Sequence, residues 1–320
     1  MELIYNNQLS ILIDVLPLYL TPKQCTKLYT INIILYNIYI DNNKFEEYYF
    51  TPKTKQELIN AVNKWCNDKD KAIIKYGNIS NWNTKYITNM RKLFNQKENF
   101  NDDISDWNTS NVKNMSYMFY NAQNFNQYIN NWNTSKVKYM AYMFGYADTY
   151  NKPLNNWNTS NIKDMEGIFY YVKEFNQPID KWDISSVTRL RKMFAYAIKF
   201  NQPLNNWNTQ NVNDIAHIFS HTKDFNQPLN NWNTSKVYSM NWAFYATWEF
   251  NQPLDNWNTS NVRHLSRMFQ YSKKFNQSIH NWNIEKVEYI TNIFHKAKAF
   301  TQDMSCWEKL FGKHIYNSAF

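Results

Sequence analysis

Ten tryptophans recur at a constant spacing of 25 residues, and this period constrains the fold more than any other feature of the chain. A fixed short period is typical of a solenoid, in which each repeat buries its apolar face against its neighbours. We therefore expect a stack of nine full repeats, with the last tryptophan opening a C-terminal cap. The ten are Trp82, Trp107, Trp132, Trp157, Trp182, Trp207, Trp232, Trp257, Trp282 and Trp307.

Positions are counted from the tryptophan of each repeat as position 1. Position 6 is Ile or Val, position 9 is Met, Leu or Ile, and position 13 is always Phe, as in Phe94 and Phe194. These spacings of three and four continue to Ala122 at position 16, and they predict a helix of about three turns. Thr109 and Ser110, which precede this stretch, are the expected N-cap residues.

The second half of each repeat changes its period. Position 19 is aromatic and position 23 is Leu or Ile in the first eight repeats, with Asn201-Gln202-Pro203 between them in a well-formed copy. This pattern predicts a short strand over positions 19 to 24, paired with the same segment of the next repeat. Strands lie about 4.8 Å apart and helices about 8–10 Å apart, so a stack of both should curve with its strands on the concave face. The predicted fold is an α/β solenoid: a curved, leucine-rich-repeat-like stack of strand-turn-helix coils, with a small all-α N-terminal region.

Asparagines also form columns at positions 2, 20 and 25, for example Asn108, Asn126 and Asn131. Aligned in a stack, their side chains can bond the turn backbones of adjacent coils. The expected domains are a capping or F-box-like helical region (1–50), a helical lead-in or N-terminal cap (51–78), the repeat solenoid (79–306) and a C-terminal cap (307–320).

The repeat core reads Trp-Asn-Thr-Ser-Asn-Val-x-x-Met-x-x-Met-Phe-x-x-Ala-x-x-Phe-Asn-Gln-x-Leu, and it resembles the BspA-like leucine-rich-repeat family, including the repeats of mycoplasma surface lipoproteins. The resemblance covers about residues 79 to 307, and the stretch 52–82 resembles the lead-in of such arrays. It implies a repeat solenoid that binds other proteins. Bacterial members are often secreted adhesins with a signal or lipid anchor.

The N-terminus departs from those secreted members. It begins Met1-Glu2-Leu3 and carries Asp14 in its apolar run, so we expect neither a signal peptide nor a membrane span. The composition, rich in Asn, Ile, Lys and Tyr, resembles that of copies encoded by giant DNA viruses of protists. These features favour an intracellular, cytoplasmic protein, in the host cytoplasm for a viral one.

Residues 9 to 40 contain a second resemblance, to the latter half of an F-box. It implies docking to a Skp1-type adaptor of a cullin ubiquitin ligase, although the opening of the F-box pattern is replaced around residues 8–11. Thr21 followed by a proline also indicates, without any family, the start of a helix. Two alternatives therefore stand, a working F-box and a helical cap over the first coil. The candidate adaptor-binding residues are Leu16, Leu20, Pro22, Leu28 and Ile31.

The formal net charge is +9, and basic residues gather on the predicted helix face and the turn that follows it. Such a column is either a solvated outer face or a surface for an acidic protein partner. No nucleic-acid-reading motif accompanies it, so nucleic acid is not expected as a partner. The candidate basic edge comprises Lys173, Arg191, Lys223, Arg263, Arg267, Lys273 and Lys298.

Residues that carry chemistry are scarce. The three cysteines are widely separated, and four glycines make no phosphate-binding loop. His217 and His221 lie four residues apart, but Ile218 follows the first histidine where a zinc protease motif needs Glu. We expect no cofactor, no metal and no enzyme activity. The predicted function is a protein–protein interaction solenoid, with the substrate-receptor role as one form of it. The alternative is a structural or adhesive surface protein with no link to ubiquitin.

Overall fold

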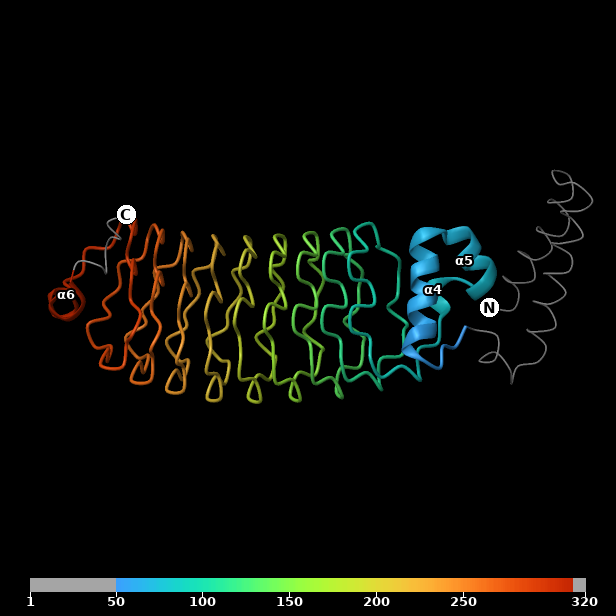
Figure 1. The fold of residues 1–320 in the computed structure, drawn as a ribbon, viewed down its shortest axis with the longest axis horizontal. Helices are drawn as coiled ribbons and strands as arrows, with labels where there is room; N and C mark the ends of the chain where they lie inside the picture. The colour runs from blue at the N-terminus through green and yellow to red at the C-terminus, as the bar shows by residue number, and fades with distance from the viewer. Residues whose placement is uncertain (1–49, 313–320) are drawn as a thin grey trace, which may run out of the picture. The chain divides into compact units, whose positions relative to one another are not determined.

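The computed structural model describes residues 50–312, which belong to one compact unit. Its helices are few: α4 (Lys55–Asn67), α5 (Lys69–Tyr76), the 3-10 helix η2 (Ile79–Asn81) and α6 (Ser305–Phe311). Between η2 and α6 the chain forms coils that lie side by side in sequence order (Figure 1). The part of the chain that carries the repeats is therefore a stack of turns.

The predicted strand-turn-helix coil is wrong. Positions 9 to 16 form consecutive turns, and positions 11 and 15 are left-handed in all nine coils, as at Lys92 (φ 63°) and Gln96 (φ 63°). An α-helix cannot contain such residues, because its backbone is right-handed throughout. Asn108 and its equivalents, rather than the expected Thr or Ser, cap the turn before this segment, accepting from Ser110 N at 3.0 Å.

Backbone hydrogen bonds between coils replace those of the expected helix. The N–H groups of positions 9, 11, 13 and 15 donate to carbonyls of the next coil, as from Met90 to Asn114 (2.8 Å) and from Phe94 to Met118 (2.8 Å). Between them, Leu93 donates to Met90 three residues earlier, at 3.2 Å. Strand-like pairing in the described residues is limited to isolated parallel bridges, which join position 8 of successive coils. Each coil is thus bonded to the next along the segment that was predicted to be a helix.

The predicted strand over positions 19 to 24 is also absent from every coil of the described region. Here asparagine side chains join the coils: Asn126 N donates to Asn101 Oδ1 at 2.9 Å, and Asn151 N donates to Asn126 Oδ1 at 3.0 Å. The same contact recurs through the stack to Asn276. Without strands and helices of different widths, the reason for the predicted curvature disappears.

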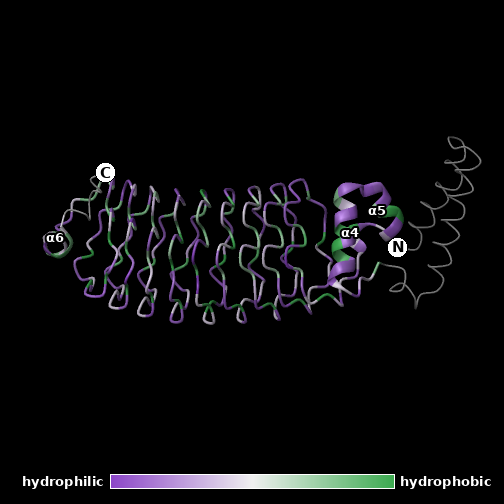
Figure 2. Cartoon of the chain, in the orientation of Figure 1, coloured by the Kyte–Doolittle hydropathy of each residue, from purple (hydrophilic) through white to green (hydrophobic). Residues whose placement is uncertain are grey.

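Columns of stacked aromatic rings fill the interior. The position-13 phenylalanines lie 5.4 to 5.9 Å apart between ring centroids in successive coils. Each also lies 3.8 to 4.2 Å from the position-19 ring of its own coil. The tryptophans are buried too, and Trp107 Nε1 donates to Ile79 O at 2.8 Å. Figure 2 shows hydrophobic and hydrophilic residues alternating along the coils.

The N-terminal helices cover the first coil. Thr54 caps α4 by accepting from Glu57 N, and the apolar face of α4 buries Leu58, Val62 and Trp65. The Trp65 ring packs edge-on against Trp82, with centroids 5.8 Å apart. This contact shields the first tryptophan of the stack from water.

Candidate functional site

Positions 10, 11, 14 and 15 project outward from the turns, and they differ between coils. In the second to eighth coils, twelve of the residues at positions 11, 14 and 15 are aromatic and half-buried, and their rings contact one another across coils. We call this surface the tyrosine face. Its rings are Tyr117, Tyr120, Tyr142, Tyr146, Tyr170, Tyr171, Tyr196, His217, His221, Trp242, Tyr245 and Tyr271.

The position-15 rings form a parallel stack. Tyr146 and Tyr171 lie 4.7 Å apart between centroids, Tyr171 and Tyr196 lie 3.9 Å apart, and Tyr196 and His221 lie 4.2 Å apart. Each inner ring is therefore covered on both faces by its neighbours. The surface that such rings leave to a partner is their edge.

Tyr170 at position 14 crosses this stack. Its ring stands nearly perpendicular to Tyr142, Tyr146 and Tyr196, at interplanar angles of 85°, 88° and 88°. Gly167 makes room for the Tyr142 ring, because a Cβ at Gly167 would lie 2.4 Å from a ring carbon of Tyr142. The arrangement ties three coils together through ring contacts.

A hollow of about 200 Å³ opens in the tyrosine face next to Tyr170. Position 14 is small in two successive coils, where Ala195 and Ser220 are buried and replace the tyrosines found at Tyr120, Tyr170 and Tyr245. The hollow is lined by Tyr170, Arg191, Lys192, Ala195, Tyr196, His217, Ser220, His221 and Trp242. It has aromatic walls, two cations and no carboxylate in its lining.

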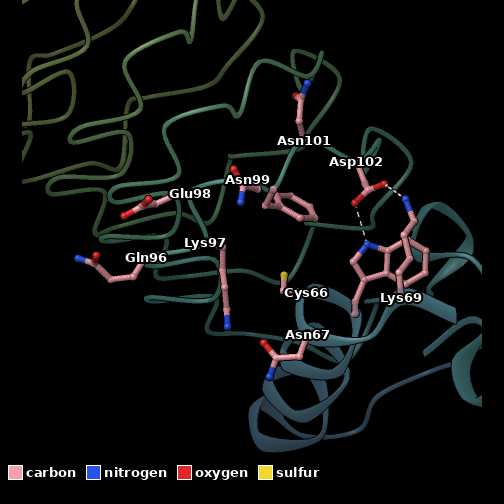
Figure 3. Close-up of a pocket in the computed structure, with 11 residues that line it drawn as sticks. Cys66, Asn67, Lys69, Gln96, Lys97, Glu98, Asn99, Asn101 and Asp102 are labelled. Atoms are coloured by element: carbon pink, nitrogen blue, oxygen red, sulfur yellow. Dashed lines mark hydrogen bonds and ion pairs between the residues drawn. The ribbon is translucent and has the colours of Figure 1, made fainter. Parts of the chain in front are cut away.

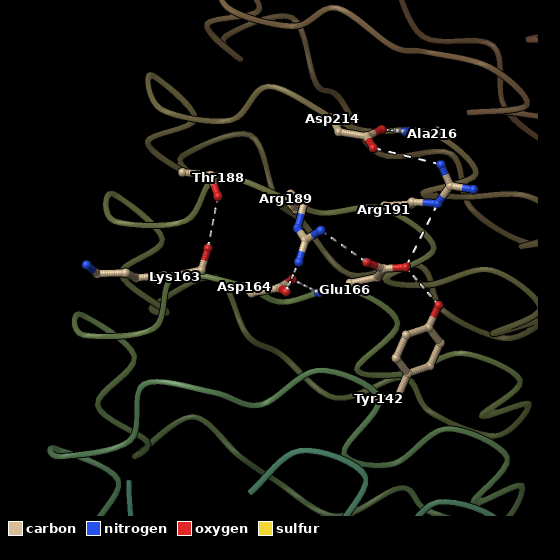
Figure 4. A network of polar contacts seen from close by, with 9 residues as sticks. All are labelled: Tyr142, Lys163, Asp164, Glu166, Thr188, Arg189, Arg191, Asp214 and Ala216. Carbon is tan, nitrogen blue, oxygen red and sulfur yellow. Dashed lines mark hydrogen bonds and ion pairs between the residues drawn. The ribbon is translucent and has the colours of Figure 1, made fainter. Parts of the chain in front are cut away.

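A polar network borders the tyrosine face (Figure 4). Tyr142 Oη donates to Glu166 Oε1 at 2.9 Å, and Asp164 pairs with Arg189. Arg191 lies 3.9 Å from both Glu166 and Asp214. The carboxylates on this border are therefore engaged by groups of the chain itself.

Cations of several coils also contact rings of the tyrosine face. Lys192 Nζ lies 5.6 Å from the Tyr170 centroid, and the guanidinium of Arg267 lies 4.6 Å from the Trp242 centroid. Within residues 50–312 no carboxylate lies within ion-pair distance of Lys192. Its ammonium is the cation beside the hollow that lacks an acidic partner in the described region.

Burial and the nearby cations Arg191 and Lys192 lower the pKa of His217 to about 4. Because the folded state resists protonation of this ring, its contribution to stability is complete above pH 6.5 and is lost as the pH falls towards 4.

We expect the His217→Asn variant to lose less stability than the wild type when the pH falls from 7.5 to 5. Asparagine is accepted at this position of the coil, as Asn292 shows. The expected difference is about 1 kcal/mol, in urea unfolding curves at the two pH values. Equal losses in both proteins would contradict the cause assigned to the shift.

A larger hollow, of about 660 Å³, lies between α4 and the first coils (Figure 3). Asp102 faces it and accepts from Trp65 Nε1 at 2.7 Å, while Lys69 pairs with the same carboxylate at 2.5 Å. Amide, lysine and glutamate side chains make up most of the remaining lining. Because Asp102 binds side chains of the N-terminal helices, it holds these helices on the first coil. This hollow therefore lies at the structural contact between the N-terminal helices and the stack.

The seven residues of the basic edge do not form one surface of free cations. Lys173 pairs with Asp148 at 2.5 Å and Arg263 pairs with Glu288 at 3.2 Å, each across one coil. Lys223 and Lys273 lie 4.2 and 3.3 Å from the centroid of the Trp248 ring. Lys298 is exposed in the last coil, and Arg191 and Arg267 lie on the tyrosine face.

The predicted adaptor-binding residues Leu16, Leu20, Pro22, Leu28 and Ile31 lie outside the described residues. Within the described part of the chain, no three His, Cys, Asp or Glu side chains are grouped to hold a metal ion. No helix between residues 50 and 312 has the length and apolarity needed to cross a membrane.

Comparison with known proteins identifies one family. The family described as mycoplasma protein of unknown function, DUF285, matches three overlapping segments, residues 62–176, 152–247 and 228–315. These segments contain all nine coils. Searches of curated proteins and of solved structures found no match.

Proposed function

The chain belongs to the family described as mycoplasma protein of unknown function, DUF285, and we propose that this member recognises another protein through its tyrosine face. The binding surface consists of ring edges, hydroxyl groups and a few cations on a regular stack. The hollow in the tyrosine face, about 200 Å³, is smaller than the roughly 300–1,000 Å³ of typical small-molecule sites. A binding role fits this shape better than catalysis.

The observation that carries the proposal is the composition of the variable positions. The same backbone site accepts Lys92, Gly167 and Asn292 at position 11, so the fold does not require Tyr142 or Trp242 there. Tyrosine, tryptophan and arginine are the residues enriched where proteins bind one another. A concentration of rings at positions that packing leaves free supports selection for a partner.

We expect the double variant Tyr171→Asn/Tyr196→Gln to weaken partner binding at least tenfold, since it removes two adjacent rings of the tyrosine face. Asn121 and Gln96 occupy the same left-handed position in other coils, so the variant carries residues that this backbone accepts. The measurement is capture on full-length protein from cells that express it, with partners identified by mass spectrometry and their affinities determined with purified proteins.

The matched control is Tyr86→Asn/Tyr128→Pro. It removes two exposed tyrosines outside the tyrosine face and introduces residues found at the same positions of other coils, as in Asn111 and Pro153. The control should bind within twofold of the wild type. A partner captured equally by both double variants would show that the tyrosine face is not its binding site.

The substrate-receptor form of the proposal depends on residues 1–50. Capture of a Skp1-type adaptor and a cullin by the full-length chain, but not by a fragment that contains only residues 51–320, would support it. Capture of partners by both forms without any adaptor would favour the alternative of a structural or adhesive repeat protein.

A further inference from the structure

We infer that the hollow in the tyrosine face binds a carboxylate side chain from an acidic protein segment, with Lys192 as its charge partner. This inference rests on the proposed protein-recognition function and names the chemistry of the partner. It depends on three properties of the hollow: its size, its charge and the orientation of its rings.

The size of the hollow suits one side chain of a larger partner. Its volume is about 200 Å³, and its base is formed where Ala195 and Ser220 leave room at position 14. Rings of Tyr170, Tyr196 and Trp242 surround this space. Small pockets walled by buried aromatic residues are where interfaces concentrate their binding energy.

The charges that reach the hollow are positive. Arg191 and Lys192 line it, whereas Glu166 and Asp214 do not. Those two acids are held on the border by Arg191, by the Tyr142 hydroxyl and by Ala216 N, which donates to Asp214 at 2.8 Å. A carboxylate in the hollow would supply the acidic partner that Lys192 lacks among the described residues.

The orientation of the rings favours an anion over a nucleobase. Tyr196 is stacked between Tyr171 and His221, and His217 is stacked on Trp242 at 5.3 Å. Base stacking requires an exposed ring face, whereas both faces of Tyr196 and the face of His217 towards Trp242 are covered. The edge of an aromatic ring carries the positive end of its quadrupole, so the exposed edges attract a carboxylate.

The two histidines give this site a pH dependence that can be measured. Burial lowers both pKa values, with Arg191, Lys192 and His221 adding to the effect at His217 and Lys223 at His221. The nearby carboxylates Glu166 and Asp214 are held by Arg191. A bound carboxylate stabilises the protonated rings, so it raises both pKa values, and binding strengthens as the pH falls.

The test uses full-length protein with histidines labelled at 13Cε1, observed by NMR during titration with a glutamate decapeptide. A glutamine decapeptide is the uncharged control. We expect the glutamate peptide to shift the His217 and His221 signals and to raise their pKa values, while the glutamine peptide shifts neither. Absence of these shifts with the glutamate peptide would overturn the inference.

Two lysine variants separate a specific site from general attraction to a basic protein. Lys192→Asn introduces the residue found at position 11 in Asn292, and Lys138→Asn introduces the residue found at position 7 in Asn213. Both remove one positive charge. We expect Lys192→Asn to weaken binding at least fivefold and Lys138→Asn to leave it within twofold; equal weakening would overturn the inference.

A third variant tests the hollow without removing charge. Ser220→Tyr fills position 14 with the residue found there in Tyr120, Tyr170 and Tyr245, and it should abolish the histidine shifts. If a thymidine decanucleotide binds at the same histidines more tightly than the glutamate peptide, the inferred ligand would be a nucleic acid instead of a carboxylate, and the inference would be overturned. If the glutamate peptide fails while partner capture still depends on Tyr171 and Tyr196, the carboxylate inference falls and protein recognition stands. If capture is also independent of those rings, the proposed function falls as well.

Discussion

Replacing Phe169 with alanine is expected to lower the free energy of unfolding by about 3–5 kcal/mol. The ring is fully buried, lies between Phe144 and Phe194 at 5.8 Å on each side, and contacts Phe175 at 3.8 Å. Its removal leaves a cavity at the junction of three coils and takes away several aromatic pairs, each of which adds about 0.5–1.5 kcal/mol beyond burial. Because each coil is stabilised through its neighbours, the loss acts on two interfaces at once.

The measurement for Phe169→Ala is urea unfolding followed by circular dichroism and tryptophan fluorescence. Tyr289→Ala is the control. That side chain is 56% exposed and stacks on one ring, His264 at 5.0 Å, so its removal should change stability by about 1 kcal/mol or less. Similar losses from the two substitutions would show that the stacked rings are not the main source of stability.

Replacing Gly167 with alanine is expected to destabilise the protein by about 2–4 kcal/mol. A left-handed backbone costs a residue with a side chain about 1–2 kcal/mol, and Gly167 has φ +60°. The new Cβ would also overlap the Tyr142 ring, where forced overpacking adds about 1–3 kcal/mol. Moving that ring would disturb its hydrogen bond to Glu166 and with it the border of the tyrosine face.

The complementary substitution is Lys92→Gly at the same position of the first coil. There an exposed lysine already has φ 63°, so glycine relieves backbone strain and should raise stability by up to about 1 kcal/mol. In a helix the same change would lower stability by about 1 kcal/mol. The sign measured for Lys92→Gly in urea unfolding therefore separates the observed turns from the helix predicted by the sequence pattern.

The helix prediction failed for a specific reason. A helix buries one residue in every three or four, and so does a succession of turns in which Leu93 bonds back to Met90 and Lys97 bonds back to Phe94. The apolar pattern at positions 9, 12, 13 and 16 is the same in both structures. What separates them is the left-handed backbone at positions 11 and 15, and Lys, Tyr and His there give none of the usual glycine or asparagine signals.

The sequence pattern did not predict the tyrosine face, for a related reason. The aromatic residues at positions 11, 14 and 15 were visible in the sequence. On the predicted helix they would also share the solvent-facing side, but the axes of neighbouring helices lie about 8–10 Å apart. Consecutive turns and close coil spacing instead bring Tyr171 and Tyr196 to 3.9 Å. The basic edge was predicted from the sequence as a column of cations, but several of these cations pair with groups of neighbouring coils. Such partners, as Asp148 for Lys173, follow only from the way the coils stack.

The sequence by itself determined the period, the number of coils and most of the buried columns, because a regular spacing of Trp and Phe can bury its rings only by stacking equivalent positions. The asparagine column at position 20 was also predictable as a bond between neighbouring coils. Only the tertiary structure decided the path of the backbone and the position of the hollow. Each N–H at positions 9 to 15 could find a carbonyl within its own segment or in the next coil, and that choice depends on how closely the coils approach.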